Sequence, residues 1–220
     1  MADDEHFENF TDGGEAGVDR GDANVQVFSD LDHSNLDAHG QRWERLIFER
    51  CRFGDAKLTG LVTVGCSFVE CDFTQAQLSQ SHHARSAFVS CAFTDTELQD
   101  ARFADCRFTG SAFDSCSLAG IKFDRGDLSS VSLDGAELSG VDLSNLRLYD
   151  ASLVEADLSG CDLSGADLRE ARLQGASFES ADLRGALLDG IDLRQVNLAG
   201  ATIDADQALD LVRGIGIAIG

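Results

Sequence analysis

Hydrophobic residues recur at every fifth position through most of this chain. From Phe48 to Ile203 an apolar residue, usually Phe or Leu, marks the centre of 32 consecutive pentapeptides, and only Thr63 and His83 depart from this rule. A small or apolar residue lies two positions before each centre, and the other three positions are mostly polar or Gly. The pattern predicts a repeated unit with two inward-facing and three outward-facing positions.

A five-residue period fits neither an α-helix of about 3.6 residues per turn nor a strand, whose side chains alternate between two faces. We therefore expect each pentapeptide to form a corner that turns the chain through about a quarter-circle. Four corners close a coil of about 20 residues, and stacked coils pair their backbone groups with those above and below. The sequence predicts an all-β fold, a quadrilateral parallel β-helix of about eight coils over residues 46–205.

Residues 20 positions apart are expected to stack as ladders in such a fold. One predicted ladder starts with Phe48 and Phe68 and ends with Leu168 and Leu188. Aromatic rungs thus fill the N-terminal half of the core, and leucine rungs fill the C-terminal half.

All the cysteines fall at the small inward position of the repeat. We interpret them as small buried hydrophobic residues rather than as metal ligands or redox sensors. These seven residues are Cys51, Cys66, Cys71, Cys91, Cys106, Cys116 and Cys161.

The two irregular centres, Thr63 and His83, lie one coil apart on the same side. His82 and His83 suggest metal binding or a pH switch, but no Cys, Asp or second His pair lies at a ligand-like spacing beside them. We expect a distorted or bulged face there, and no metal site or cofactor. No arrangement of catalytic residues emerges, so an enzyme is not predicted.

Both ends of the repeat need a cap, because open edges of a β-helix can pair with other chains. Residues 1–24 form an acidic leader that we expect to be disordered, and residues 25–45 form an N-terminal cap or a degenerate coil. Asp204 and Gln207 resemble a capping box that opens a short helix, Ala205 to Arg213, ended by Gly214. Residues 206–220 are expected to form a helix and strand that cap the fold.

The apolar residues of this C-terminal segment suggest either a monomeric cap or a two-fold dimer contact, and we favour the dimer. They are Ala208, Leu209, Leu211, Val212, Ile215, Ile217 and Ile219.

The charge of the chain restricts its partners. The net charge is −22, with 17 basic residues against 39 acidic ones. This balance argues against direct binding of nucleic acid, which needs clustered Lys and Arg, and favours a partner with a basic surface. No apolar run is long enough to span a membrane, and the acidic N-terminus is unlike a signal peptide, so a cytoplasmic protein is expected.

The residue before each centre points outward, and on one side these positions run Val62, His82, Arg102, Lys122, Asp142, Asp162, Asp182 and Thr202. Stacked like charges repel, so the three aspartates either reflect the repeat consensus or form a stripe that faces a partner. Further acidic residues broaden this surface on the two neighbouring sides: Glu137 and Asp157 on one, Asp127 and Asp167 on the other.

The repeat consensus Ala-Asp-Leu-x-x, as in residues 156–160 and 181–185, resembles that of the pentapeptide-repeat family. This resemblance covers residues 46–205 and implies a right-handed quadrilateral β-helix. Two non-consensus segments, residues 79–88 and 200–209, are similar to segments of the MfpA and Qnr type of this family. Members of that type bind DNA gyrase as mimics of duplex DNA and lessen fluoroquinolone action.

The MfpA and Qnr resemblance implies a homodimer that binds gyrase through its acidic face, and the alternative is a non-catalytic scaffold for another protein partner. Residues 46–205 hold 25 acidic and 13 basic residues, a net charge of −12. Eight coils should span about 38 Å, a length over which duplex DNA carries roughly 22 charges. The predicted β-helix therefore has about half the charge density of DNA.

Overall fold

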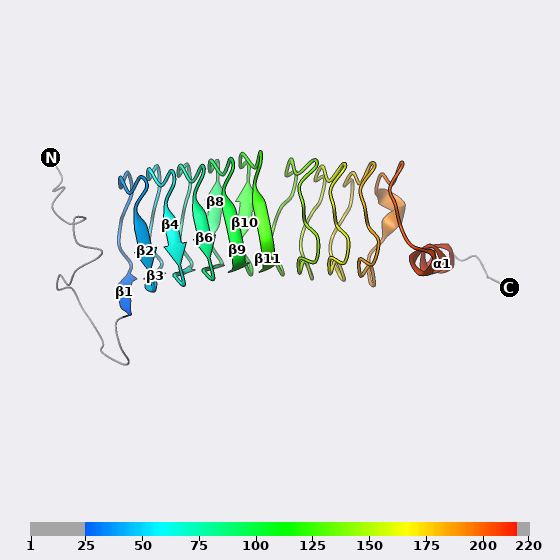
Figure 1. The fold of residues 1–220 in the computed structure, drawn as a ribbon, viewed down its shortest axis with the longest axis horizontal. Coiled ribbons are helices and arrows are strands. Elements are labelled where there is room, and N and C mark those ends of the chain that lie inside the picture. Colours follow the sequence, from blue (N-terminus) through cyan, green and yellow to red (C-terminus); the bar gives the residue numbers. More distant parts are fainter. Residues whose placement is uncertain (1–24, 215–220) are drawn as a thin grey trace.

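The fold is a long rod of stacked coils that ends in a helix (Figure 1). The computed structural model describes residues 25–214. Residues 20 positions apart pair in parallel along the rod, from Gln26↔Leu46 to Asp182↔Thr202. The predicted parallel β-helix is confirmed.

The corners of the coils lie at every fifth residue. Residues at these positions have positive φ, whether they are Gly, as at Gly160 (φ 67°), or not, as at Asp105 (φ 52°) and Arg125 (φ 50°). Because corners recur every five residues and pairing recurs every 20, each coil has four sides. We name them by their outward positions: side A includes residues 42 and 62, side B 47 and 67, side C 52 and 72, and side D 57 and 77.

Regular strands are confined to the N-terminal part of the described chain, and isolated β-bridges continue the ladders beyond it. The strands are β1 (Gln26–Ser29), β2 (Arg42–Glu44), β3 (Leu46–Glu49), β4 (Val62–Val64), β5 (Ser67–Val69), β6 (His82–Ala84), β7 (Ala87–Val89), β8 (Ala92–Thr94), β9 (Arg102–Arg107), β10 (Ala112–Asp114) and β11 (Lys122–Asp127). Strand β9 continues around a corner from side A to side B. It therefore connects strands β2, β4 and β6 of side A with strands β1, β3, β5 and β7 of side B in one sheet, and it also pairs with β11. A second, two-stranded sheet pairs β8 with β10 on side C.

Several inward cysteines and serines in the strand region have a role that follows from the strand geometry. In a turn-type corner the amide three residues after the centre donates to the carbonyl of the centre, as Ala166 N does to Leu163 O at 3.0 Å. Where strands replace this turn, a side chain from the next coil donates to that carbonyl instead, as Cys91 Sγ does to Phe68 O (3.4 Å) and Ser111 Oγ to Phe88 O (2.9 Å). A small donor at the inward position therefore satisfies a buried acceptor.

The core consists of the predicted ladders. Phe48, Phe68 and Phe88 stack with ring centroids 5.1 and 4.9 Å apart, and all three are buried. Leucines such as Leu148 and Leu168 continue the ladder and are fully buried. Aromatic and leucine coils thus share one continuous core.

The side beneath Thr63 and His83 is regular, so the expected distorted or bulged face was wrong. Thr63 pairs with His83 in the undisturbed β4–β6 ladder, and both side chains are buried. Thr63 Oγ1 lies 2.7 Å from His83 Nδ1 and 3.0 Å from Ser86 Oγ, while His83 Nε2 lies 2.9 Å from Ser81 Oγ. Mutual hydrogen bonds let these polar side chains occupy core positions without distorting the backbone.

Residues 26–45 form a coil of the same kind as those that follow. They pair in register with residues 46–64, and Trp43 lies buried at the centre position of side A. The number of coils therefore differs slightly from the predicted eight, because this segment lacks the apolar consensus yet keeps the corners at Asp30, Asn35 and Gly40.

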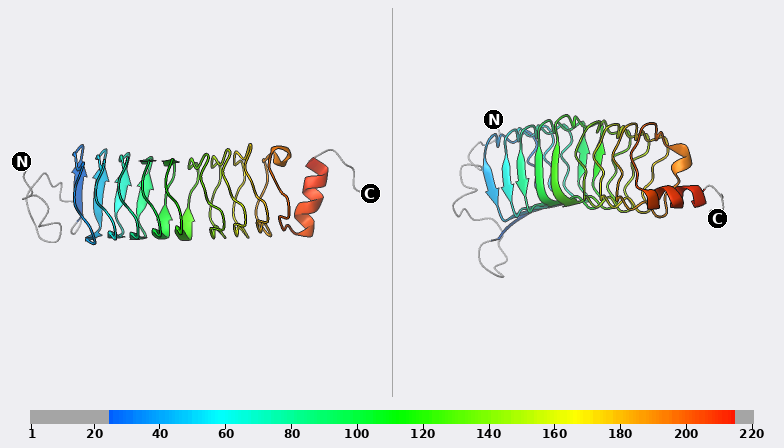
Figure 2. Two further views of the ribbon diagram at one scale, coloured as in Figure 1. Left: turned by 90° about the horizontal axis from the view of Figure 1, so that it is seen from above. Right: turned by 45° about the vertical axis from the view of Figure 1, so that its right-hand side comes forward.

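The C-terminal end is covered by helix α1 (Ala205–Gly214), preceded by the short 3-10 helix η2 (Leu193–Gln195). Figure 2 shows α1 lying across the end of the rod. The capping box is present, since Gln207 N donates to Asp204 Oδ1 (3.1 Å) and Asp204 N to Gln207 Oε1 (2.9 Å). Gln207 Nε2 also donates to Leu183 O (2.7 Å) and Ala186 O (2.8 Å), which joins the helix to the last coils.

Candidate partner-binding surface

The outward positions of side A stack along the rod and form two hydrogen-bonded ladders, one up to Lys122 and one from Asp142 onward. Its N-terminal part pairs through β2, β4, β6, β9 and β11, and its C-terminal part through the bridges Asp142↔Asp162, Asp162↔Asp182 and Asp182↔Thr202. The three aspartates therefore stack in successive coils, as the sequence indicates.

Each of these aspartates also has a local structural role. Asp142 Oδ1 accepts a hydrogen bond from Ser144 N at 3.0 Å, and Asp162 Oδ1 accepts one from Ser164 N at 2.9 Å. Such bonds stabilise the corner that follows and account for Asp in the consensus. Both carboxylates are nevertheless exposed, and neither forms an ion pair with a described residue.

Asp182 differs from the other two because it is half-buried and paired. Arg184 Nη2 lies 2.5 Å from Asp182 Oδ2, and the hydrogen bonds from this guanidinium lower the pKa of Asp182 to about 2. The cation cancels much of the charge of Asp182. The sequence signal for such pairing is Asp-Leu-Arg, which also places Arg169 beside Asp167 and Arg194 beside Asp192.

Side D contributes two further carboxylates next to this ladder. Glu137 and Asp157 pair across successive coils and are both exposed. Hydrogen bonds from the Ser159 hydroxyl and amide lower the pKa of Asp157, which keeps it ionised. In these two coils the corner between sides D and A carries only small residues, Ser139, Gly140, Ser159 and Gly160. We call this group of carboxylates, formed by Glu137, Asp142, Asp157 and Asp162, the acidic edge.

The two carboxylates predicted on side B are not part of the acidic edge. Arg147 lies between Asp127 and Asp167 in the ladder. Asp167 also pairs with Arg169 Nε at 2.8 Å, and hydrogen bonds from Arg169 lower the pKa of Asp167. Side B therefore alternates in sign along the rod.

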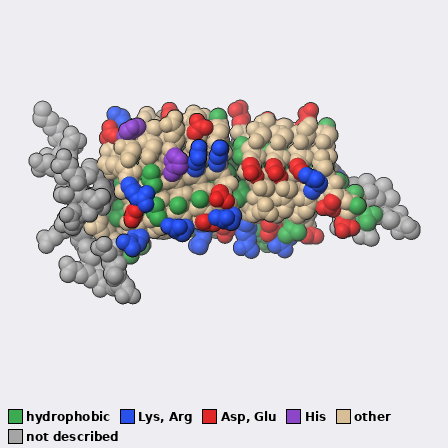
Figure 3. All heavy atoms as spheres, viewed as in Figure 1, with side chains coloured by type: hydrophobic (Ala, Val, Ile, Leu, Met, Phe, Trp, Pro, Cys, Tyr) green, Lys and Arg blue, Asp and Glu red, His purple; other side chains and the backbone are tan. Residues whose placement is uncertain are grey.

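The N-terminal part of side A carries the opposite charge. His82, Arg102 and Lys122 are exposed at stacked positions, and among residues 25–214 no carboxylate forms an ion pair with Arg102 or Lys122. Figure 3 shows a row of basic side chains that is continued by a row of acidic ones on the same face. The five-residue period that aligns the aspartates also aligns these basic residues.

The same division holds for the whole solenoid. Residues 46–125 contain 10 acidic and 8 basic residues, a net charge of −2, whereas residues 126–205 contain 15 acidic and 5 basic residues, a net charge of −10. Four coils span about 19 Å, over which duplex DNA carries about 11 charges. The C-terminal half alone therefore approaches the charge density of DNA, which the average over the whole rod conceals.

The residues predicted to form a dimer interface are only partly described. On α1, Leu209 is 39 % exposed and Ala208 is half-buried. Leu211 and Val212 lie within α1, and Ile215, Ile217 and Ile219 lie outside the described residues. Leu209 thus offers an exposed apolar side chain at the C-terminal end of the rod.

The described residues hold no cluster of three or more His, Cys, Asp or Glu side chains that could bind a metal ion. None of their helices has the length and apolar character that crossing a membrane requires. All seven cysteines are free thiols, and burial raises the pKa of Cys106 and of Cys161 to about 11. These buried thiols are therefore protonated near neutral pH and are poor nucleophiles.

The repeat and the fold agree with two family models. A model described as "Pentapeptide repeat region" matches residues 64–143, and one described as "Pentapeptide repeats (8 copies)" matches residues 147–185 and 176–204. The chain belongs to the pentapeptide-repeat family. A comparison of its sequence with curated proteins finds no match.

Among solved structures the rod is similar to QnrB1, a plasmid-mediated fluoroquinolone resistance protein. A trypsin-treated form of QnrB1 matches with a TM-score of 0.79 and 26% identity, over 89% of this chain and 98% of QnrB1. Full-length QnrB1 matches with a TM-score of 0.76 and 25% identity, over 88% of this chain and all of QnrB1. The similarity therefore extends over nearly the whole length of that protein.

Proposed function

We propose that this protein binds the DNA-binding surface of DNA gyrase as a mimic of duplex DNA and thereby modulates the enzyme. The observation that carries the proposal is the net charge of −10 on residues 126–205, close to that of DNA of the same length. The similarity to the fluoroquinolone resistance protein QnrB1 supports the choice of partner. A protein of this kind acts by occupying a surface and needs no catalytic residue.

The acidic edge supplies the contacts in this proposal. Its four carboxylates are exposed, and no described cation pairs with them, so they remain available to Lys and Arg of a partner. Surfaces that bind DNA are basic, and an acidic rod is attracted to them before contact. Because the charge of residues 46–125 is more balanced, we expect the first contact to be made by the C-terminal half.

Dimerisation extends the proposal. Two copies that meet through α1 would form a longer rod with both acidic halves near its centre. The exposed Leu209 on α1 supports this contact. Such a dimer would present about twice the length of DNA-like charge to the enzyme.

A supercoiling assay with purified gyrase tests the proposed function. We expect the protein to inhibit supercoiling at micromolar concentration, to co-elute with gyrase, and to alter cleavage of DNA by gyrase in the presence of a fluoroquinolone. An unchanged supercoiling rate together with separate elution would refute gyrase binding and leave the alternative, a scaffold for another basic protein.

A further inference from the structure

The ladders of hydrogen bonds between coils are interrupted in the middle of the rod. Three of the amides that would cross this interval are those of Leu118, Gly120 and Phe123, and within the described part of the chain none of them donates to a backbone carbonyl of the next coil. Their counterparts one coil later do so: Leu138, Gly140 and Leu143 donate at 2.8 to 2.9 Å. We call this interval, in which residues 115–125 face residues 134–144, the seam.

The seam crosses sides D and A, whereas sides B and C hold the same two coils together. On side B, Phe108 N donates to Asp127 O at 2.8 Å, and β9 pairs with β11. On side C, Ser132 N donates to Ser111 O, and Phe113 N donates to Ser132 O, both at 2.9 Å. Two adjacent sides are therefore open, and the opposite two are closed.

Packing inside the seam explains the separation. On side A, Phe103 has the small Ala101 at its inward position, but Phe123 has Ile121 and is followed one coil later by Val141. Two bulky residues in successive coils overfill the core, which displaces the backbone. On the N-terminal side of the seam, the Phe103 and Phe123 rings are 5.7 Å apart, compared with 4.7 Å for Phe93 and Phe113 on side C, so Phe123 is displaced from regular stacking.

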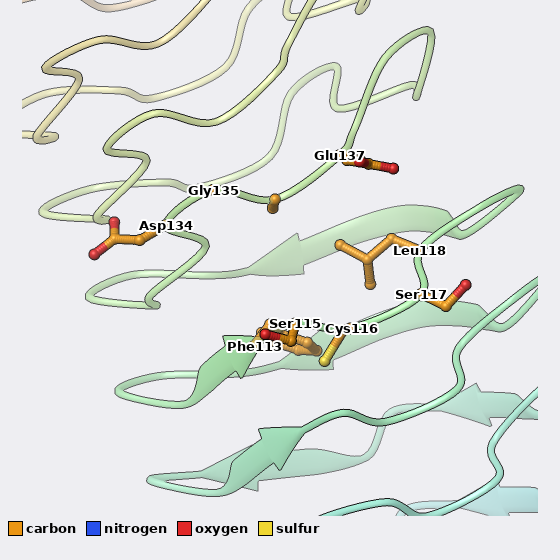
Figure 4. Close-up of a pocket in the computed structure, with 9 residues that line it drawn as sticks. Phe113, Ser115, Cys116, Ser117, Leu118, Asp134, Gly135 and Glu137 are labelled. Atoms are coloured by element: carbon orange, nitrogen blue, oxygen red, sulfur yellow. The ribbon is translucent and has the colours of Figure 1, made fainter.

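Core residues at the seam are more exposed than their counterparts in the coil before. Phe123 and Cys116 are half-buried, although Phe103 and Cys106 are 2% exposed. A cavity of about 310 Å³ lies in the seam and is lined by residues of both coils, including Cys116, Leu118 and Glu137. Figure 4 shows Asp134, Gly135 and Glu137 on one coil facing Ser115, Cys116, Ser117 and Leu118 on the coil before.

We propose that the seam is a hinge that divides the rod into two rigid bodies, residues 25–125 and 126–205. Closing the seam restores backbone hydrogen bonds, whereas opening it relieves the overfilled core, and these opposing effects give the protein two arrangements of similar free energy. The motion turns about sides B and C. Because the seam separates the basic part of side A from the acidic part, bending changes the direction of one charged segment relative to the other.

Disulfide trapping tests the hinge in the full chain without any partner. Ser117 and Glu137 occupy equivalent positions on either side of the seam, and closure would bring their Cα atoms to about 4.8 Å, within the range for a disulfide. The matched control is the pair Glu97 and Ser117, which already forms a β-bridge one coil earlier. Both double cysteine variants are made with Cys116→Ser, so that the half-buried native thiol cannot compete.

We expect Ser117→Cys with Glu137→Cys to cross-link on oxidation, at a rate about tenfold below that of Glu97→Cys with Ser117→Cys. Ile121→Ala, which introduces the residue type found at Ala101, should raise that rate toward the control. Equal rates in the two pairs would show that the seam is always closed, and no cross-link at all would show that it is fixed open. Either result overturns the hinge, and neither depends on gyrase.

Hydrogen exchange gives a second measurement in the unmodified protein. The amides of Leu118, Gly120 and Phe123 should exchange at least tenfold faster than those of Leu138, Gly140 and Leu143. Equal protection of the two sets would contradict an open seam.

Discussion

Removal of the acidic edge tests which half of the rod contacts a partner. The variant combines Glu137→Gln, Asp142→Asn, Asp157→Asn and Asp162→Asn. Asn keeps a side-chain oxygen that can accept the corner hydrogen bonds from Ser144 and Ser164, so the fold should be retained. The substitutions remove four of the ten net negative charges of residues 126–205.

The expected loss follows from the exposure of these groups. Each exposed charge pair contributes about 0.2 to 1 kcal/mol, so four pairs contribute about 1 to 4 kcal/mol, which corresponds to a roughly 5-fold to 1,000-fold weaker interaction. The assay is inhibition of gyrase supercoiling as a function of protein concentration. The loss should shrink as salt rises, because salt screens exposed charges over about 8 Å at physiological ionic strength.

A matched control removes the same number of charges from the N-terminal half. It combines Asp95→Asn, Glu97→Gln, Asp100→Asn and Asp114→Asn, and we expect less than a threefold effect. Equal losses in the two quadruple variants would mean that only total charge matters, which refutes the assignment of the contact to the acidic edge.

Three further predictions concern the seam, the buried histidine and the C-terminal helix. In denaturant unfolding, Asp157→Pro should lower the free energy of unfolding by at least about 1 kcal/mol more than Glu137→Pro does. The reason is that Asp157 N donates to Ala136 O, whereas Glu137 N makes no described hydrogen bond. Burial lowers the pKa of His83 to about 3, so below about pH 6.5 the unfolded chain binds a proton that the folded chain does not, and stability decreases as the pH is lowered. Between pH 7.5 and 5.0 this loss of stability amounts to about 2 kcal/mol. His83→Phe should abolish it. Leu209→Asp should give a monomer by light scattering while Asp206→Asn leaves the dimer intact, and an unchanged mass for Leu209→Asp would count against the contact through α1.

The β-helix and its C-terminal helix could be predicted from the sequence because each depends on local spacing. The five-residue period fixes which residues face inward, and the capping box needs only Asp204 and Gln207 three positions apart. The stacking of Asp142 on Asp162 follows from the same period. These features require no knowledge of how side chains pack between coils.

The features that escaped prediction depend on contacts between coils. Ile121 and Val141 each satisfy the apolar pattern, and only their stacking opens the seam. Thr63 and His83 break the pattern separately, and only their hydrogen bond at 2.7 Å makes them compatible with the core. The first coil was also missed as a regular coil, because residues 26–45 keep the corner positions but not the apolar consensus.

The polar cluster around His83 has a consequence for how the chain reaches its folded state. Most coils of the rod are interchangeable, so a folding chain that skipped 20 residues would still align its leucines and recover most of its backbone bonds. His83 cannot take part in such an error, because displacement by one coil separates its ring from Thr63 and leaves buried polar atoms unsatisfied, at a cost of about 1 to 3 kcal/mol each. A single irregular rung can thus exclude a misalignment of its own coils that regular rungs would tolerate.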